Sequence, residues 1–190
     1  MHMQIQISLL HLAWLAGGLA CGLGPKLLAQ SHKTDSYLSL AYQKAQAGNY
    51  RQALRYYDKA LETDPQHAEA YYHRGNVRYD LKDYQGAIED CQAALRLNPG
   101  LIDAFFNLGI SHYHLKEYAE AITALSQALQ ANAQDGESYY WRGMAFFRIN
   151  KINLACQDWN QAKNLGNAYV NTYLSRYCQE EGQIDSGAPE

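Results

Sequence analysis

The sequence predicts an all-α protein, a solenoid of four helix pairs that ends in a capping helix. The first observation is a 34-residue period of small and aromatic residues that runs through four copies. The second is that each copy contains two apolar stretches at helical spacing with a break between them. The chain has 190 residues, of which 47% are hydrophobic and 18% charged, and this composition suits one folded repeat array with tails.

The period is carried by five series of residues. The small series are Ala41, Gly75, Gly109, Gly143; Ala53, Ala87, Ala121, Ala155; and Ala60, Ala94, Ala128, Ala162. The largely aromatic series are Tyr37, Tyr71, Phe105, Tyr139; and Tyr50, Tyr84, Tyr118, Ile152. These series define four tandem units, residues 34–67, 68–101, 102–135 and 136–169, and Pro65 and Pro99 close the first two.

The second unit shows the physical basis of the pattern. Its second apolar stretch carries Ala87, Ile88, Cys91, Ala94 and Leu95, which share one face of a helix. Small residues at Gly75 and Ala87 allow the two helices of the unit to approach closely. One such unit cannot bury its apolar face alone, so its stability must come from stacking on its neighbours.

This pattern resembles the tetratricopeptide repeat family over about residues 34–169. The resemblance implies a right-handed superhelical solenoid of helix-turn-helix units, in which the first helix of each unit lines the concave face. It also implies a scaffold that binds other proteins and has no catalytic residues. The repeat serves many tasks, so the resemblance specifies the fold more closely than the function.

Residues 168–180 are expected to form the capping helix. Tyr169, Val170, Tyr173, Leu174 and Tyr177 form an apolar stripe that would cover the last unit. Residues 181–190 are acidic and rich in small residues, and they are expected to be a disordered tail.

Residues 1–29 are expected to be a secretory signal peptide or a membrane anchor. No Asp, Glu, Lys or Arg occurs from Ile7 to Gly24, and small residues follow the apolar run. Cleavage after Ala29 or after Ala20 would export the repeats to the periplasm or the medium.

Three alternatives for this segment stay open. The segment could remain as a membrane anchor, in which case Lys26 and Lys33 on its C-terminal side favour cytoplasmic repeats. It could be a lipoprotein signal that ends at Cys21, or a packed helix of a cytosolic protein. Membrane contact is expected only if the segment is retained.

Two charge pairs are expected inside the repeats. Units two and four carry Arg74 and Arg142 just before the small residue, and Asp90 and Asp158 sixteen residues later. Units one and three have neither charge at these positions. Because the two helices of a unit run antiparallel, the pairs Arg74–Asp90 and Arg142–Asp158 should form, with a structural role.

The resemblance places a strip of aromatic and polar side chains on the concave face. The predicted partner-binding groove contains Tyr42, Tyr72, Asn76, Phe106, Asn107, Ile110, Tyr140 and Met144. Tyr72, Phe106 and Tyr140 are expected to be exposed, whereas Tyr79, Tyr113 and Phe147 fit either the groove or the core.

This surface suits an extended peptide or an amphipathic helix of a partner protein. Its acidic rim favours a neutral or basic segment. Some members of the family bind a C-terminal carboxylate with a clamp of Lys, Arg and Asn. Asn76 and Asn107 match the clamp, but Tyr72, Glu137 and Trp141 stand at the basic positions, so no such clamp is expected.

No catalytic, metal or cofactor site is expected. His112 and His114 diverge around a helix, and no metal-binding or phosphate-binding motif occurs. Cys91 and Cys156 are expected in the core. If the protein is exported, a disulfide among Cys91, Cys156 and Cys178 is possible, but their separation along the array disfavours it.

The net charge of −3 argues against a nucleic-acid partner, and no small-molecule substrate is expected. The leading function is a protein-binding scaffold. The alternatives are a structural module that assembles through its end caps and, third, an enzyme.

Overall fold

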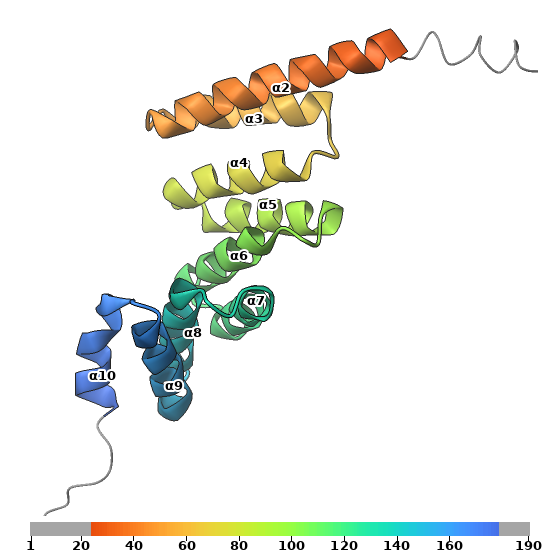
Figure 1. Cartoon of the computed structure of the whole chain (residues 1–190). Helices are drawn as coiled ribbons and strands as arrows, with labels where there is room; N and C mark the ends of the chain where they lie inside the picture. Colours follow the sequence, from red (N-terminus) through yellow and green to blue (C-terminus); the bar gives the residue numbers. More distant parts are fainter. Residues whose placement is uncertain (1–23, 179–190) are drawn as a thin grey trace, which may run out of the picture. The chain divides into compact units, whose positions relative to one another are not determined.

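The computed structural model describes residues 24–178, which are almost entirely helical (Figure 1). Most of the predicted signal segment, the tail and the last two residues of the predicted cap lie outside the described residues. The chain forms two compact units, residues 1–70 and 71–190. The predicted all-α class is confirmed.

The helices pair in the order that the period predicts. The first compact unit contains α2 (Gly24–Gln46) and α3 (Tyr50–Thr63), and α4 (Ala68–Asp80) runs across the boundary. The second contains α5 (Tyr84–Leu97), α6 (Ile102–His114), α7 (Tyr118–Ala131), α8 (Gly136–Arg148), α9 (Ile152–Asn164), the 3₁₀ turn η1 (Ala168–Val170) and α10 (Asn171–Tyr177). Each predicted 34-residue unit thus holds one pair, and α2 begins ten residues before the first predicted unit.

The turn inside each pair repeats one backbone conformation. A left-handed residue occurs every 34 positions, with φ of +71° at Gly48, +64° at Lys82, +65° at Lys116 and +60° at Asn150. After α4 the N–H groups of Lys82 and Asp83 donate to the carbonyls of Tyr79 and Arg78, at 2.8 and 2.9 Å. These bonds satisfy the last carbonyls of the helix and reverse the chain within a few residues.

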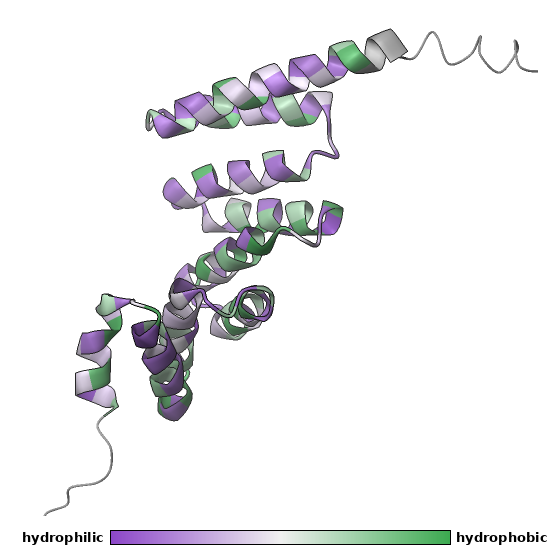
Figure 2. Ribbon diagram, viewed as in Figure 1, coloured by the Kyte–Doolittle hydropathy of each residue, from purple (hydrophilic) through white to green (hydrophobic). Residues whose placement is uncertain are grey.

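The small-residue series marks the points where paired helices touch. A Cβ atom at Gly143 would lie 2.7 Å from Cδ1 and Nε1 of Trp159, and one at Gly109 would lie 2.6 Å from Cγ of Leu125. The alanines of the other two small series are buried throughout, so each helix presents one packed face. Figure 2 shows the consequence, with hydrophobic residues interspersed among hydrophilic ones along the helices.

At the end of the array η1 and α10 pack against α9, and α10 ends at Tyr177. Val170 is fully buried beside Trp159, whose ring lies 4.9 Å from that of Tyr173. Trp159 is also fully buried, and its Nε1 has no hydrogen-bond partner among the described residues.

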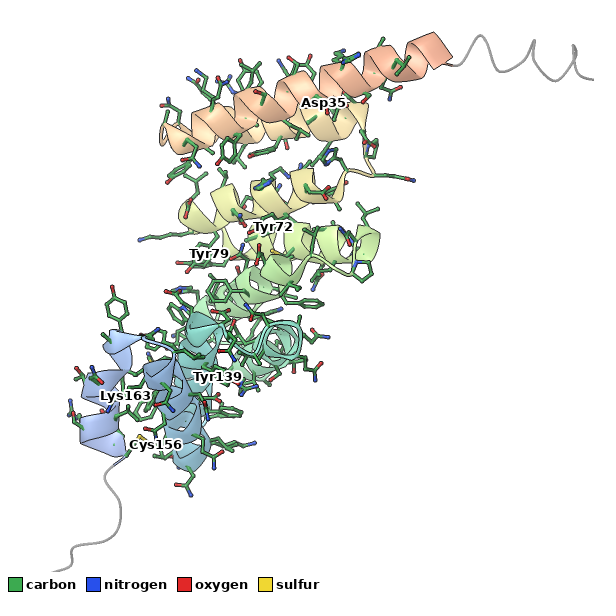
Figure 3. The ribbon with its side chains drawn as sticks, viewed as in Figure 1. Asp35, Tyr72, Tyr79, Tyr139, Cys156 and Lys163 are labelled. Atoms are coloured by element: carbon green, nitrogen blue, oxygen red, sulfur yellow. A yellow bond between two sulfur atoms is a disulfide. The ribbon has the colours of Figure 1, made fainter. Side chains whose placement is uncertain are left out.

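The expectation against a disulfide is wrong, because Cys156 and Cys178 form one, with their Cα atoms 5.6 Å apart (Figure 3). The chain reverses at Gly166, so α10 packs against α9 and its end returns to the start of α9. Proximity in space therefore overrides the separation of 22 residues along the chain. Cys156 is consequently a half of a disulfide and not a free core thiol.

Within the described residues, no helix has both the length and the apolar character needed to cross a membrane.

Candidate functional site

The second compact unit contains an open groove of about 570 Å³. We call it the aromatic groove, and its lining residues are Tyr72, Asn76, Tyr79, Asp80, Asp103, Phe106, Asn107, Ile110, Asn132, Asp135 and Glu137. Tyr72, Asn76 and Tyr79 share a face of α4 because Asn76 and Tyr79 follow Tyr72 by four and seven residues. Figure 3 labels Tyr72 and Tyr79. Phe106, Asn107 and Ile110 give α6 a matching face.

The centre of the groove is a small polar network. Nδ2 of Asn107 donates to Oδ1 of Asn76 at 2.5 Å, which joins α4 to α6. The Tyr72 hydroxyl is also close to both amides. Burial, with a smaller contribution from Asp103, raises the pKa of Tyr72, although hydrogen bonds to Asn76 and Asn107 counteract part of that rise. Tyr72 is therefore a neutral hydroxyl at physiological pH, able to donate and accept.

One wall of the groove is fixed by an aromatic cluster. The Tyr79 hydroxyl lies 3.0 Å from Nε2 of His114, and the His114 ring stacks on Tyr84 at 4.6 Å. Burial lowers the pKa of His114, so at neutral pH its ring is uncharged and shares one hydrogen bond with the Tyr79 hydroxyl through Nε2. Tyr79 thus both lines the groove and packs on its neighbours, so it combines the two roles, groove and core, that the sequence left open.

The groove is acidic. Among its described lining residues are four carboxylates, Asp80, Asp103, Asp135 and Glu137, and no lysine or arginine. Asp103 and Glu137 lie in the first turns of α6 and α8, where a negative charge favours the helix dipole. Asp135 is the N-cap of α8 and accepts from the N–H of Glu137 at 3.0 Å.

Five of the eight predicted groove residues line the aromatic groove: Tyr72, Asn76, Phe106, Asn107 and Ile110. Tyr72 and Phe106 are partly exposed, whereas Ile110 is 5% exposed and forms part of the floor. Tyr42 is 53% exposed on α2, which belongs to the other compact unit.

Neither Tyr140 nor Met144, the two groove residues predicted in the fourth unit, lines the aromatic groove. Met144 is only 8% exposed and belongs to the core around Trp159. The ring of Tyr140 packs on Trp141 at 5.2 Å and faces Tyr173 of α10 at 6.3 Å. The cap packs against α9 and reaches Tyr140 through Tyr173.

The two alternatives left open for Tyr113 and Phe147 are likewise resolved in favour of the core. Tyr113 is buried, and Phe147 packs against Trp159 and Tyr177. Asn132 and Asp135 line the groove from the segment between α7 and α8, and sequence reasoning missed both. That reasoning considered only the faces of the first helices, and the period gives no signal for this connection.

Both predicted charge pairs are present. Arg74 donates to Asp90 through Nε at 2.9 Å and Nη2 at 2.6 Å, and Arg142 donates to Asp158 at 2.8 and 2.7 Å. These bidentate geometries are the strongest form of the arginine–carboxylate contact. The hydrogen bond to Asp158 is the largest cause of the raised pKa of Arg142.

Unit two has one more cation in its pair, which sequence reasoning missed. Nη1 of Arg78 lies 3.2 Å from Oδ2 of Asp90, so two arginines share that carboxylate. The corresponding residue of unit four is Phe146, and Asp158 has no second arginine at that place. The sequence signal for this contact is the spacing of twelve residues between Arg78 and Asp90, which lie on the two antiparallel helices of the unit.

No group of three metal-ligating side chains occurs between residues 24 and 178. Cys91 is fully buried, and burial together with the nearby Asp90 raises the pKa of its thiol to about 12. The thiol therefore stays protonated at neutral pH and is a poor nucleophile, which agrees with the core position predicted for it.

Several solved structures share this fold. A MamA protein matches with a TM-score of 0.72 and 23% identity, over 76% of this chain and 79% of that one. YrrB, described as a tetratricopeptide repeat protein with an unusual peptide-binding site, matches with a TM-score of 0.66 and 23% identity, over 81% and 84% of the two chains. The first repeat domain of Spaghetti (RPAP3), bound to the HSP90 peptide SRMEEVD, matches with a TM-score of 0.62 and 21% identity, over 63% and 95%. At these identities the structures establish the fold alone.

Sequence comparison identifies the family. No curated protein matches the chain significantly. Two tetratricopeptide repeat models match, one over residues 38–102 and the other over residues 78–145. Together they span residues 38–145, which is more than half of the 190 residues, and they agree with the helix pairs of the structure. The chain belongs to the tetratricopeptide repeat family.

Proposed function

We propose that the chain is a non-catalytic scaffold that holds a segment of a partner protein in the aromatic groove. The observation that carries the proposal is a groove that combines three aromatic side chains with the hydrogen-bonded amides of Asn76 and Asn107. Aromatic rings supply apolar contact area at a small entropic cost, and amides bind polar backbone groups. The family is typically non-catalytic, which is consistent with this role.

Two structures of the same fold support a peptide as the ligand class. YrrB has a peptide-binding site and the RPAP3 domain is bound to SRMEEVD. The latter peptide carries three acidic side chains, whereas four carboxylates line the groove of this chain. We therefore propose a peptide partner of a different charge and no binding of SRMEEVD.

Replacing both Tyr72 and Phe106 with alanine is expected to weaken partner binding by about tenfold or more, because both rings line the groove. The measurement is affinity capture from the native host followed by quantitative mass spectrometry. A matched control replaces Tyr169 and Leu97 with alanine, because both side chains are exposed and neither lines the groove.

A protein retained by wild type and control but lost by the groove variant would support the proposal. Circular dichroism must show that the variant keeps its helix content. Proteins retained equally by all three forms, or self-association alone, would instead place binding on another surface or favour the structural role.

We further propose that the repeats act after export, with cleavage after Ala29. The Cys156–Cys178 disulfide supports this, because such bonds persist in oxidising compartments and are rare in the cytosol. Contacts of α2 with α3 also support it. Leu28 and Ala29 are exposed, whereas Gln30 donates a hydrogen bond to the Thr63 carbonyl of α3 and Thr34 is buried. Removing the residues before Gln30 would leave these contacts in place.

Mass spectrometry of the protein purified from its host is expected to find an N-terminal peptide that begins at Gln30. A start at Cys21 would favour the alternative cleavage after Ala20 or a lipoprotein. Detection of Met1 in the mature protein would overturn cleavage and favour a retained segment.

A further inference from the structure

We infer that the aromatic groove binds an extended segment that carries lysine or arginine beside an apolar residue. This inference rests on the proposed function and specifies the chemistry of the partner. It follows from the charge of the groove, from the place of Asp80, from the aromatic walls and from the amide pair.

The charge of the groove differs from that of the whole chain. The chain has 16 basic and 19 acidic residues, which is close to balance. The described lining residues of the groove, in contrast, include four carboxylates and no lysine or arginine. A cationic segment would therefore meet a complementary surface, and an anionic one would be repelled.

The place of Asp80 is not explained by helix stability. The other three carboxylates lie at or just inside helix N-termini, where negative charge is favourable. Asp80 instead ends α4, where the helix dipole disfavours a carboxylate. Since this residue also lines the groove, a cationic ligand gives it a favourable partner that the helix does not.

The aromatic walls suit a cationic side chain as well as an apolar one. Tyr72, Tyr79 and Phe106 line the same groove as the carboxylates. A guanidinium or ammonium group can stack on such rings while its charge is neutralised by a nearby carboxylate. The long aliphatic stems of Lys and Arg also bury apolar surface against the rings.

The amide pair favours an extended segment over an amphipathic helix. The bond between Asn76 and Asn107 uses one donor of Asn107 and one lone pair of Asn76, and the Tyr72 hydroxyl bonds to both amides. Each amide has two donors and two lone pairs, so capacity for a ligand is left. An extended segment exposes backbone N–H and C=O groups that can bond to these amides. A helix satisfies its own backbone groups internally and offers only side chains.

The chain itself does not supply such a segment outside the described residues. Residues 179–190 carry Glu180, Glu181, Asp185 and Glu190, with no lysine or arginine. Residues 1–23 contain no charged side chain. Residues 1–23 and 179–190 therefore do not fit the groove, and we assign it to a segment of another protein.

The test is selection of phage-displayed random nonapeptides on the full chain. Peptides selected by wild type are expected to be enriched at least about twofold in Lys and Arg over the unselected library. Replacing Asp80 and Asp103 with asparagine should weaken the best synthetic peptide by about tenfold. The matched control replaces Glu89 and Glu120 with glutamine, which removes two charges from exposed sites outside the groove, and should change affinity little.

The outcomes separate this inference from the proposed function. The selected peptides could be acidic or uncharged and lose binding in the Tyr72→Ala, Phe106→Ala variant. That result would overturn the inference of a basic segment but keep the groove as the binding site. Basic peptides weakened equally by the Glu89 and Glu120 control would show a general charge effect and overturn the inference. No selected peptide, or binding indifferent to the Tyr72 and Phe106 changes, would overturn the proposed function itself.

Discussion

Replacing Arg142 with leucine is expected to destabilise the protein by about 3–5 kcal/mol, because it leaves a buried carboxylate without its cation. Asp158 is 5% exposed and accepts two hydrogen bonds from Arg142, at 2.8 and 2.7 Å. Burial of an unpaired charge costs far more than the net stabilisation that the intact pair provides. The measurement is urea unfolding followed by tryptophan fluorescence, to which Trp159, next to Asp158 on α9, contributes.

The double variant Arg142→Leu, Asp158→Leu is the control that identifies the cause. It removes both charges, so it should recover most of the stability that the single change loses. A double variant as unstable as the single one would show that lost packing, and not the stranded carboxylate, causes the effect.

Unit two offers an internal comparison for the same physics. Arg74→Leu should cost less than Arg142→Leu, because Arg78 remains 3.2 Å from Asp90 and compensates its charge. Asp90 is 2% exposed, so the difference between the two units cannot come from shallower burial.

Much of the fold could be predicted from the sequence because the packing constraint repeats every 34 residues. Gly143 must be small because the ring of Trp159 lies where its Cβ would be, and Gly109 must be small because of Leu125. The left-handed turn residue repeats with the same period, yet the residue type at this position varies: Gly48, Lys82, Lys116 and Asn150. A constraint on backbone conformation that different residue types meet leaves no compositional signal, so it was not predicted.

The candidate site was predictable only where a unit has a neighbouring unit on both sides. Tyr72 and Phe106 lie in the middle units and line the groove as expected. Tyr140 and Met144 have equivalent places in the period, but the cap packs against their helix pair and withdraws them from the groove. Periodicity assigns equivalent positions the same environment, and it cannot describe the end of an array.

The disulfide was missed for a related reason. Separation along the chain measures how far apart two cysteines lie in an extended array, but a cap folds back on the last helix pair. The sequence signals of that reversal were Gly166 and the seven-residue α10, which together return Cys178 to Cys156.

Replacing both Cys156 and Cys178 with serine is expected to lower the free energy of unfolding by roughly 3 kcal/mol, through the extra entropy of the unfolded chain. The bond closes a loop with a sequence separation of 22 residues that contains most of α9 and the whole cap. The measurement is thermal unfolding of wild type and variant, each with and without a reductant. The reductant should bring wild type down to the stability of the variant and leave the variant unchanged. Equal melting temperatures for oxidised and reduced wild type would contradict a stabilising disulfide.

The loss should begin at the cap, because a helix of seven residues does not persist without tertiary contacts. Val170 and Tyr173 shield Trp159, which is fully buried while the cap is in place. Reduction should therefore raise quenching of tryptophan fluorescence by acrylamide at temperatures below the main unfolding transition. Cys91 should not interfere by thiol–disulfide exchange, because burial raises the pKa of its thiol to about 12 and keeps the thiol protonated. Quenching that rises only together with global unfolding would show that packing of Val170 and Tyr173 holds the cap without the disulfide, so that the bond stabilises the array as a whole.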